Sequence, residues 1–66
     1  MTKGGGEKLM YVIIRITDGL FVSRSGMASS YTRMLQHARQ WPTRETAERE
    51  RCPENERVVS VDWVLA

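Results

Sequence analysis

The chain has 66 residues, which is enough for one small domain and too few for a deep catalytic cavity with supporting shells of side chains. One cysteine excludes an internal disulfide, and with a single histidine it leaves only carboxylates as further metal ligands. The net charge of +2 is too small to diagnose nucleic-acid binding, and no apolar run approaches the length of a membrane span. We therefore expect a protein that is not an enzyme, with no cofactor, no metal, no membrane segment and no small-molecule substrate.

Residues 1–9 precede any apolar pattern and contain three consecutive glycines, which is typical of a flexible tail. They lack the apolar run of a secretory signal, so a cytoplasmic location is expected. The run from Gly4 to Met10 can be encoded by codons that contain a purine-rich ribosome-binding sequence shortly before an ATG. This predicts that Met10 is the native start, in a bacterium or its phage, with an engineered linker as the competing explanation. Residues 10–66 then form one small domain.

The stretch 10–23 predicts a β-hairpin. Apolar side chains alternate from Met10 to Ile16, which is the period of a strand with one apolar face. Asp18-Gly19 is a strong signal for the turn, and residues 20–23 return as the second strand.

Residues 27–41 have a mixed pattern. One helical face would carry Tyr31, Met34, Leu35 and Ala38, with Ser30 as a possible cap. The residue before Pro42, in contrast, avoids helical angles. We predict a helical turn over 31–37 and then a short strand ending at Trp41.

A helix is predicted over 44–52. Thr43 is placed to cap it and Glu45 suits its first turn. Ala47 is its best core residue, so the helix should touch a sheet along a narrow line.

The last strand is predicted over 57–65, where apolar residues occupy both faces. The predicted fold is α+β: a mainly antiparallel sheet of three to four strands with one helix on one face, in the order ββ-turn-βαβ. The expected core consists of Val12, Ile14, Ile16, Leu20, Val22, Leu35, Ala38, Ala47, Val59, Val61 and Trp63.

The sequence contains no recognisable catalytic or ligand-binding motif. His37, Asp62 and the serines lack the spacing of a triad, and there is no Gly-x-Ser-x-Gly elbow. Cys52 at a helix C-terminus faces the negative end of the dipole, which disfavours a thiolate. The serine-rich stretch 23–30 has one glycine and no phosphate-loop pattern, so an ordinary loop is favoured there.

A binding surface is the remaining expectation. If the helix covers one face of the sheet, an exposed apolar patch on the other face would mark a contact with another protein or with a second copy. The basic half of the chain, residues 10–41, adds arginines beside that face, and a nucleic-acid surface of arginines and aromatic rings is the second choice. The candidate surface consists of Tyr11, Ile13, Arg15, Phe21, Arg24, Arg33 and Arg39.

The hairpin at 10–26, the sequence from Ser29 to Trp41, the capped helix and the valine-rich end together resemble small uncharacterised proteins encoded by phages, prophages and other mobile elements of Gram-positive bacteria. The resemblance implies framework roles for Tyr31, Leu35, Ala38, Trp41 and Ala47, and it transfers no catalytic residue. It implies an accessory protein that binds another protein. Inhibitors of host systems belong to this class by analogy alone.

Overall fold

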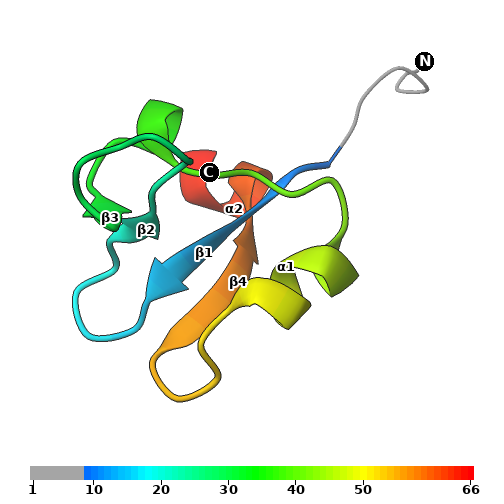
Figure 1. The fold of residues 1–66 in the computed structure, drawn as a ribbon. Coiled ribbons are helices and arrows are strands. Elements are labelled where there is room, and N and C mark those ends of the chain that lie inside the picture. Colours follow the sequence, from blue (N-terminus) through cyan, green and yellow to red (C-terminus); the bar gives the residue numbers. More distant parts are fainter. Residues whose placement is uncertain (1–8) are drawn as a thin grey trace.

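The structure is a computed structural model, and it describes residues 9–66. The predicted leader, residues 1–9, therefore lies outside the described residues except for Leu9. The elements are β1 (Tyr11–Arg15), β2 (Phe21–Val22), β3 (Tyr31–Thr32), a 3₁₀ turn η1 (Leu35–His37), α1 (Arg44–Glu50), β4 (Glu56–Ser60) and α2 (Val61–Leu65) (Figure 1). No helix described within 9–66 is long and apolar enough to cross a membrane.

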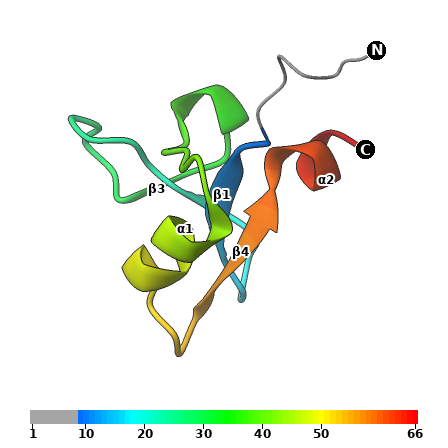
Figure 2. The same cartoon turned by 90° about the vertical axis from the view of Figure 1, so that its right-hand side faces the viewer.

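The four strands form one antiparallel sheet in the order β3-β2-β1-β4. β1 and β4 pair along their whole length, from Tyr11 opposite Ser60 to Arg15 opposite Glu56. β2 and β3 are two residues long and extend the sheet on the other side of β1. The predicted α+β class, with an antiparallel sheet and a helix on one face, is confirmed. A second short helix, α2, packs on the opposite face (Figure 2).

The β1–β2 turn follows from the Asp18-Gly19 pair. Gly19 has φ 73°, in the left-handed region that glycine enters without strain. The Asp18 carboxylate accepts a hydrogen bond of 3.3 Å from the Leu20 N–H, which closes the turn. The register that results places Phe21 opposite Ile14, so these two side chains lie on the same face of the sheet.

The helical turn predicted over 31–37 is confined to η1. Tyr31 and Thr32 instead pair with β2 as a strand, so Ser30 does not cap a helix. The ladder with β2 satisfies backbone groups that a helical turn would have used within itself.

The strand predicted to end at Trp41 is present as two isolated bridges, Ala38 with Ser23 and Trp41 with Tyr11. The second bridge has both of its backbone hydrogen bonds, with N···O distances of 2.9 and 2.8 Å. It lays Trp41 beside the start of β1, immediately before α1 begins.

α1 begins as the sequence predicts. The Thr43 hydroxyl oxygen accepts a hydrogen bond of 3.2 Å from the Thr46 N–H, which is the expected cap. The helix ends at Glu50, two residues before the predicted end. Ala47 is completely buried on its inner face, and the small side chain lets the helix lie close to β1 and β4.

The predicted last strand is wrong beyond Ser60. The Ser60 hydroxyl oxygen accepts a hydrogen bond of 3.0 Å from the Trp63 N–H and begins α2 as its N-cap. Asp62 lies in the first turn, where a negative charge is favourable. Val61 and Val64 turn toward the sheet.

Two clusters of buried side chains pack on the two faces of the sheet. The α1-side cluster consists of Ile13, Trp41, Ala47 and Val58. The α2-side cluster consists of Val12, Ala38 and Val59, with Ile14, Phe21, Leu35, Val61 and Val64 partly buried around it.

The predicted core is wrong for two residues. Ile16 is exposed because β1 ends at Arg15, and Trp63 is exposed because α2 directs it outward. Ile13, Val58 and the polar Glu56 are buried although they were not expected in the core. Trp41, outside the expected core, is buried beside Ala47, in agreement with the framework role that the resemblance implied.

Candidate binding surface

The seven residues expected at the binding surface do not share one exposed face. Ile13 is 1% exposed beneath α1, so it is not available to a partner. Phe21 lies on the opposite face, because the hairpin register places it with Ile14 in the α2-side cluster. Tyr11 is half-buried against the α1-side cluster. The prediction of an open sheet face is therefore wrong, because α1 covers one face and η1 and α2 cover the other.

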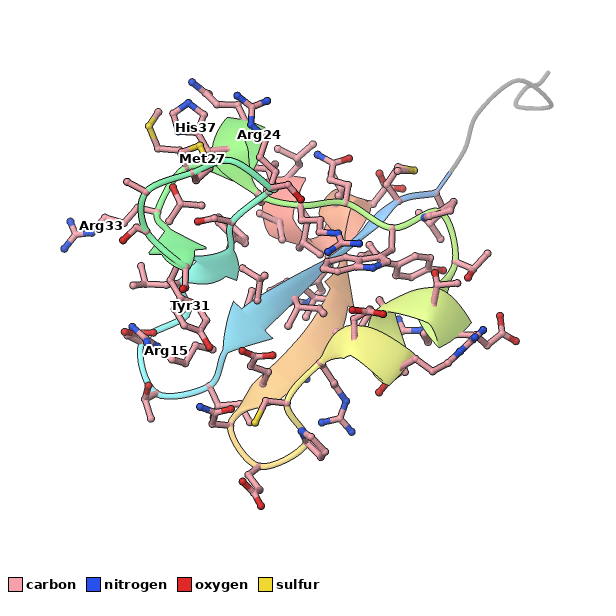
Figure 3. All side chains as sticks on the ribbon, in the orientation of Figure 1. Arg15, Arg24, Met27, Tyr31, Arg33 and His37 are labelled. Carbon is pink, nitrogen blue, oxygen red and sulfur yellow. The ribbon has the colours of Figure 1, made fainter. Side chains whose placement is uncertain are left out.

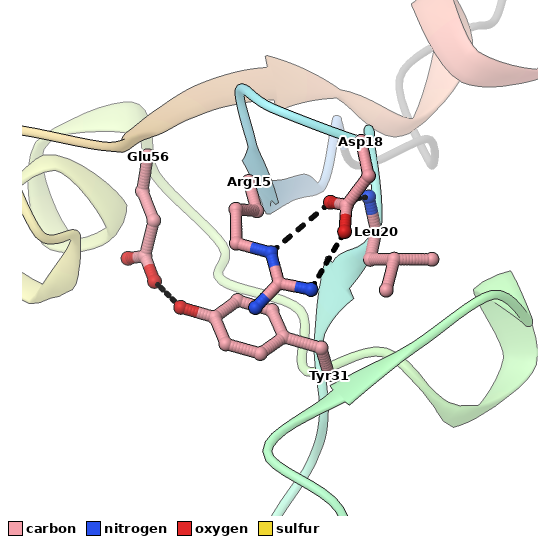
Figure 4. A network of polar contacts seen from close by, with 5 residues as sticks. All are labelled: Arg15, Asp18, Leu20, Tyr31 and Glu56. Carbon is pink, nitrogen blue, oxygen red and sulfur yellow. Dashed lines mark hydrogen bonds and ion pairs between the residues drawn. The ribbon is translucent and has the colours of Figure 1, made fainter.

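Arg15 is held by two neighbours at the end of β1 (Figure 4). Its Nε and Nη2 atoms donate hydrogen bonds of 3.1 and 2.6 Å to the Asp18 carboxylate. Its guanidinium lies 4.0 Å from the centroid of the Tyr31 ring. The hydrogen bond from Arg15 holds the pKa of Asp18 below its ordinary value. The charge of Arg15 is thus already matched within the chain.

A buried carboxylate joins three segments next to Arg15. Glu56 is 7% exposed, and its carboxylate accepts hydrogen bonds from the Tyr31 hydroxyl and, at 2.7 Å, from the Cys52 N–H. The hydrogen bond to Glu56 raises the pKa of Tyr31. The network ties β3 and the loop after α1 to β4 (Figure 4). Sequence reasoning missed it because Pro53-Glu-Asn-Glu56 has the composition of an exposed turn, and no local signal marks its second glutamate as buried.

The other predicted arginines lie on different parts of the surface. Arg24 and Arg33 are exposed, and Figure 3 shows their side chains well apart. The Arg24 N–H donates a hydrogen bond of 3.0 Å to the His37 carbonyl, which draws His37 toward Arg24. Arg39 lies over Trp41, 4.9 Å from the ring centroid. The structure therefore distributes these arginines and does not gather them into one basic patch.

The most exposed large apolar side chains lie on α2. Trp63 is 65% exposed and Leu65 is 70% exposed. The turn that carries them is ordered by the Ser60 cap and by Val61 and Val64, which pack on the α2-side cluster. We call Trp63 and Leu65 the α2 surface. Sequence reasoning missed it because alternation from Val59 to Leu65 fits a strand equally well, and one turn of helix is too short to reveal its period.

A groove of about 1060 Å³ lies on the other face of the sheet, beside the start of α1. Its lining is formed by Leu9, Tyr11, Pro42, Thr43, Arg44, Glu45, Glu48 and Arg49. The Arg44 guanidinium lies 5.0 Å from the centroid of the Tyr11 ring, so these two side chains together form one wall of the groove. We call this feature the α1 groove.

The described residues offer little catalytic or ligating chemistry. Within 9–66, no three His, Cys, Asp or Glu side chains gather as a metal site would require. His37 is half-buried and Cys52 is exposed; they lie at η1 and in the loop after α1, on different elements.

No family model, curated protein or solved structure matches the chain. What the chain does is therefore inferred from its own surface.

Proposed function

We propose that the chain is a non-enzymatic protein-binding module, which acts by occupying a surface of its partner. The observation that carries the proposal is the α2 surface, where a tryptophan and a leucine project from an ordered and capped turn. Tryptophan is the residue most enriched among those that dominate binding energy at protein interfaces. An anchored Trp63 loses little conformational freedom on binding, because its backbone is already fixed by the Ser60 cap.

The anchoring distinguishes Trp63 from an apolar residue on a loose chain end. Val61 and Val64 already contribute to the α2-side cluster, so α2 has its own inward face. Folding of the described chain does not require Trp63 or Leu65 to be covered. A partner that covers them gains their burial without having to order the turn.

The nature of the partner is proposed from the sequence. The resemblance to small phage and prophage proteins favours a bacterial host protein or a second copy of the chain, in the cytoplasm. The action would be that of an accessory protein, and inhibition of a host system is the form suggested by analogy.

Capture from a lysate tests the proposal. The tagged chain and its Trp63→Ser variant are immobilised and exposed to a bacterial lysate that also contains an untagged copy, and bound proteins are identified by mass spectrometry. We expect a bound protein that the Trp63→Ser variant loses. Ile16→Ser is the matched control, since Ile16 is also exposed but lies beyond the far end of β1. Equal capture by all three proteins, or no capture by wild type, would overturn the proposal.

A nucleic-acid-binding domain is the second candidate. It is supported by Arg24, Arg33 and Arg39, whose side chains make no ion pair with another described residue. It is disfavoured by Arg15 and Arg51, which are matched by Asp18 and Glu48. Titration against single- and double-stranded DNA at low and high salt tests it. Binding that weakens with salt and is lost in Arg24→Gln and Arg33→Gln supports it, and no binding at low salt ends it.

A further inference from the structure

We infer that the α2 surface of one copy binds the α1 groove of a second copy, so that the chain associates head to tail. The inference rests on the proposed function and names the partner of Trp63 and Leu65. Its basis is that one chain carries both an exposed apolar projection and an apolar groove, and that the described chain fills neither with the other.

The two surfaces match in size. The α1 groove has a volume of about 1060 Å³, just above the roughly 300–1,000 Å³ that characterises sites for drug-sized groups. One indole and one isobutyl group, the side chains of Trp63 and Leu65, fall within that capacity. The groove wall formed by Tyr11 and Arg44 presents an aromatic ring with a guanidinium stacked on it, which is a surface that an indole packs against favourably.

The two surfaces also match in charge. Glu48 in the groove is matched by Arg51, whose Nε lies 2.5 Å from the Glu48 carboxylate. The lining itself carries Arg44 and Arg49 against Glu45 and Glu48, and Arg51 beside it adds one positive charge, so the groove and its immediate surroundings have an excess of one positive charge. The charge on α2 is the single carboxylate of Asp62, next to Trp63. A negative projection and a positive groove attract, whereas two α2 surfaces would bring their aspartates together.

The position of the two surfaces sets the form of the assembly. α2 packs on the α2-side cluster, whereas Tyr11 in the wall of the groove packs on the α1-side cluster, so the two surfaces lie on opposite faces of the sheet (Figure 2). Because the two surfaces are unlike and lie on opposite faces, two copies joined by one such contact cannot form a second, reciprocal contact with each other. It leaves one groove and one α2 surface free at the two ends, and growth continues to a third copy.

The contact is small. Covering an aromatic side chain removes on the order of 150–250 Å² from water, and one turn of helix in one groove stays below the roughly 1,200 Å² of a stable interface. Association should therefore be weak and should depend steeply on concentration.

Sedimentation velocity of the full chain over a wide concentration range tests the inference. We expect the wild-type weight-average mass to rise beyond that of two chains. Trp63→Ser, which removes the projection, and Arg44→Glu, which reverses the charge of the groove wall, should each lower the association constant roughly tenfold or more. Ile16→Ser and Arg33→Glu are the matched controls, and both should associate as wild type does. Circular dichroism checks that every variant is folded.

A mixture of the two variants gives the sharpest result. Trp63→Ser keeps an intact groove and Arg44→Glu keeps an intact α2 surface, so together they form one contact and no more. The mixture should produce a dimer of one copy of each and nothing larger. A mixture that stays monomeric overturns the inference, as does a wild type that stays monomeric at the highest concentration. If wild type is monomeric but captures a lysate protein through Trp63, the proposed function stands and only the inference fails.

Discussion

The two faces of the sheet are closed in different ways. On the α1 side, Trp41 and Ala47 are buried members of the cluster, and the buried Glu56 accepts hydrogen bonds from Tyr31 and Cys52 at its edge. On the α2 side the cluster has three buried residues surrounded by partly buried ones, and α2, which packs on this cluster, carries the exposed Trp63. We therefore expect the α1 side to contribute more of the stability, whereas the α2 side leaves Trp63 exposed. Substitutions on the two sides should therefore separate stability from binding.

The largest effect is expected for Trp41→Ala. Trp41 is 5% exposed at the centre of the α1 side, and truncation of a buried tryptophan costs about 3–5 kcal/mol. A domain of this size has a total stability of roughly 3–10 kcal/mol, so the variant should lose a large fraction of its stability. Urea unfolding followed by circular dichroism measures the change. Trp63→Ala is the control and should change stability by less than about 0.5 kcal/mol. Similar losses in the two variants would contradict the comparison.

The next effect is expected for Tyr31→Phe, which removes one donor from Glu56. A hydrogen bond to a charged group contributes about 1.5–3 kcal/mol, and the variant should be destabilised by that order. The folded-state pKa of Tyr31 is raised above its ordinary value of 10.0, so its contribution is complete below pH 10 and is lost as the pH rises through the folded-state value. Unfolding from pH 7 to 11 should show the gap to wild type closing above pH 10. Tyr11→Phe, which removes a tyrosine hydroxyl outside this network, is the matched control at pH 7, and a gap for Tyr31→Phe that stays constant up to pH 11 would contradict the expectation.

Local chemistry made part of this fold predictable. The Thr43 cap and the Asp18-Gly19 turn depend on side chains that bond the backbone two or three residues away, and both are present as the sequence predicts. The alternation of side chains in residues 11–15 is also a local signal, and it predicted the strand β1. These features need no knowledge of which segments meet in space.

Other features depend on contacts that no local pattern encodes. The face on which Phe21 lies is set by the register of the hairpin, and a shift of one residue would have placed it beside Ile13. The Tyr31–Glu56 hydrogen bond joins residues 25 apart in the sequence. Val61 to Leu65 alternate as a strand does, and the competing signal was the capping serine at position 60. The α2 surface was missed on that account.

A matched pair of valines compares the two sides directly. Val58 is buried in the α1-side cluster, and Val64 is partly buried on the α2 side. Loss of two methyl groups should cost about 2 kcal/mol in Val58→Ala, because the buried site adds a cavity term, and about 1 kcal/mol in Val64→Ala. Thermal or urea unfolding of both variants measures the difference. An equal or larger loss in Val64→Ala would show that the α2 side is not the weaker one.

The smallest effect is expected at Asp18, the outermost member of the polar group on the α1 side. Asp18→Asn keeps a residue that suits the turn before Gly19 and can still accept from the Leu20 N–H, so the substitution removes mainly the charge that faces Arg15. The hydrogen bond from Arg15 lowers the pKa of Asp18 below its ordinary value of 3.8. A lowered folded-state pKa means that the contribution is present above pH 3.8 and is lost as the pH falls through the folded-state value. Wild type should therefore be slightly more stable than the variant at pH 7, and the two should converge below pH 3.8 in unfolding experiments at low salt, where exposed charges are least screened. Glu54→Gln, which removes an exposed carboxylate outside this group, is the matched control at pH 7. If Asp18→Asn is as stable as wild type at every pH, then Arg15 is held by Tyr31 alone, and the polar closure of the α1 side ends at Glu56 and Tyr31.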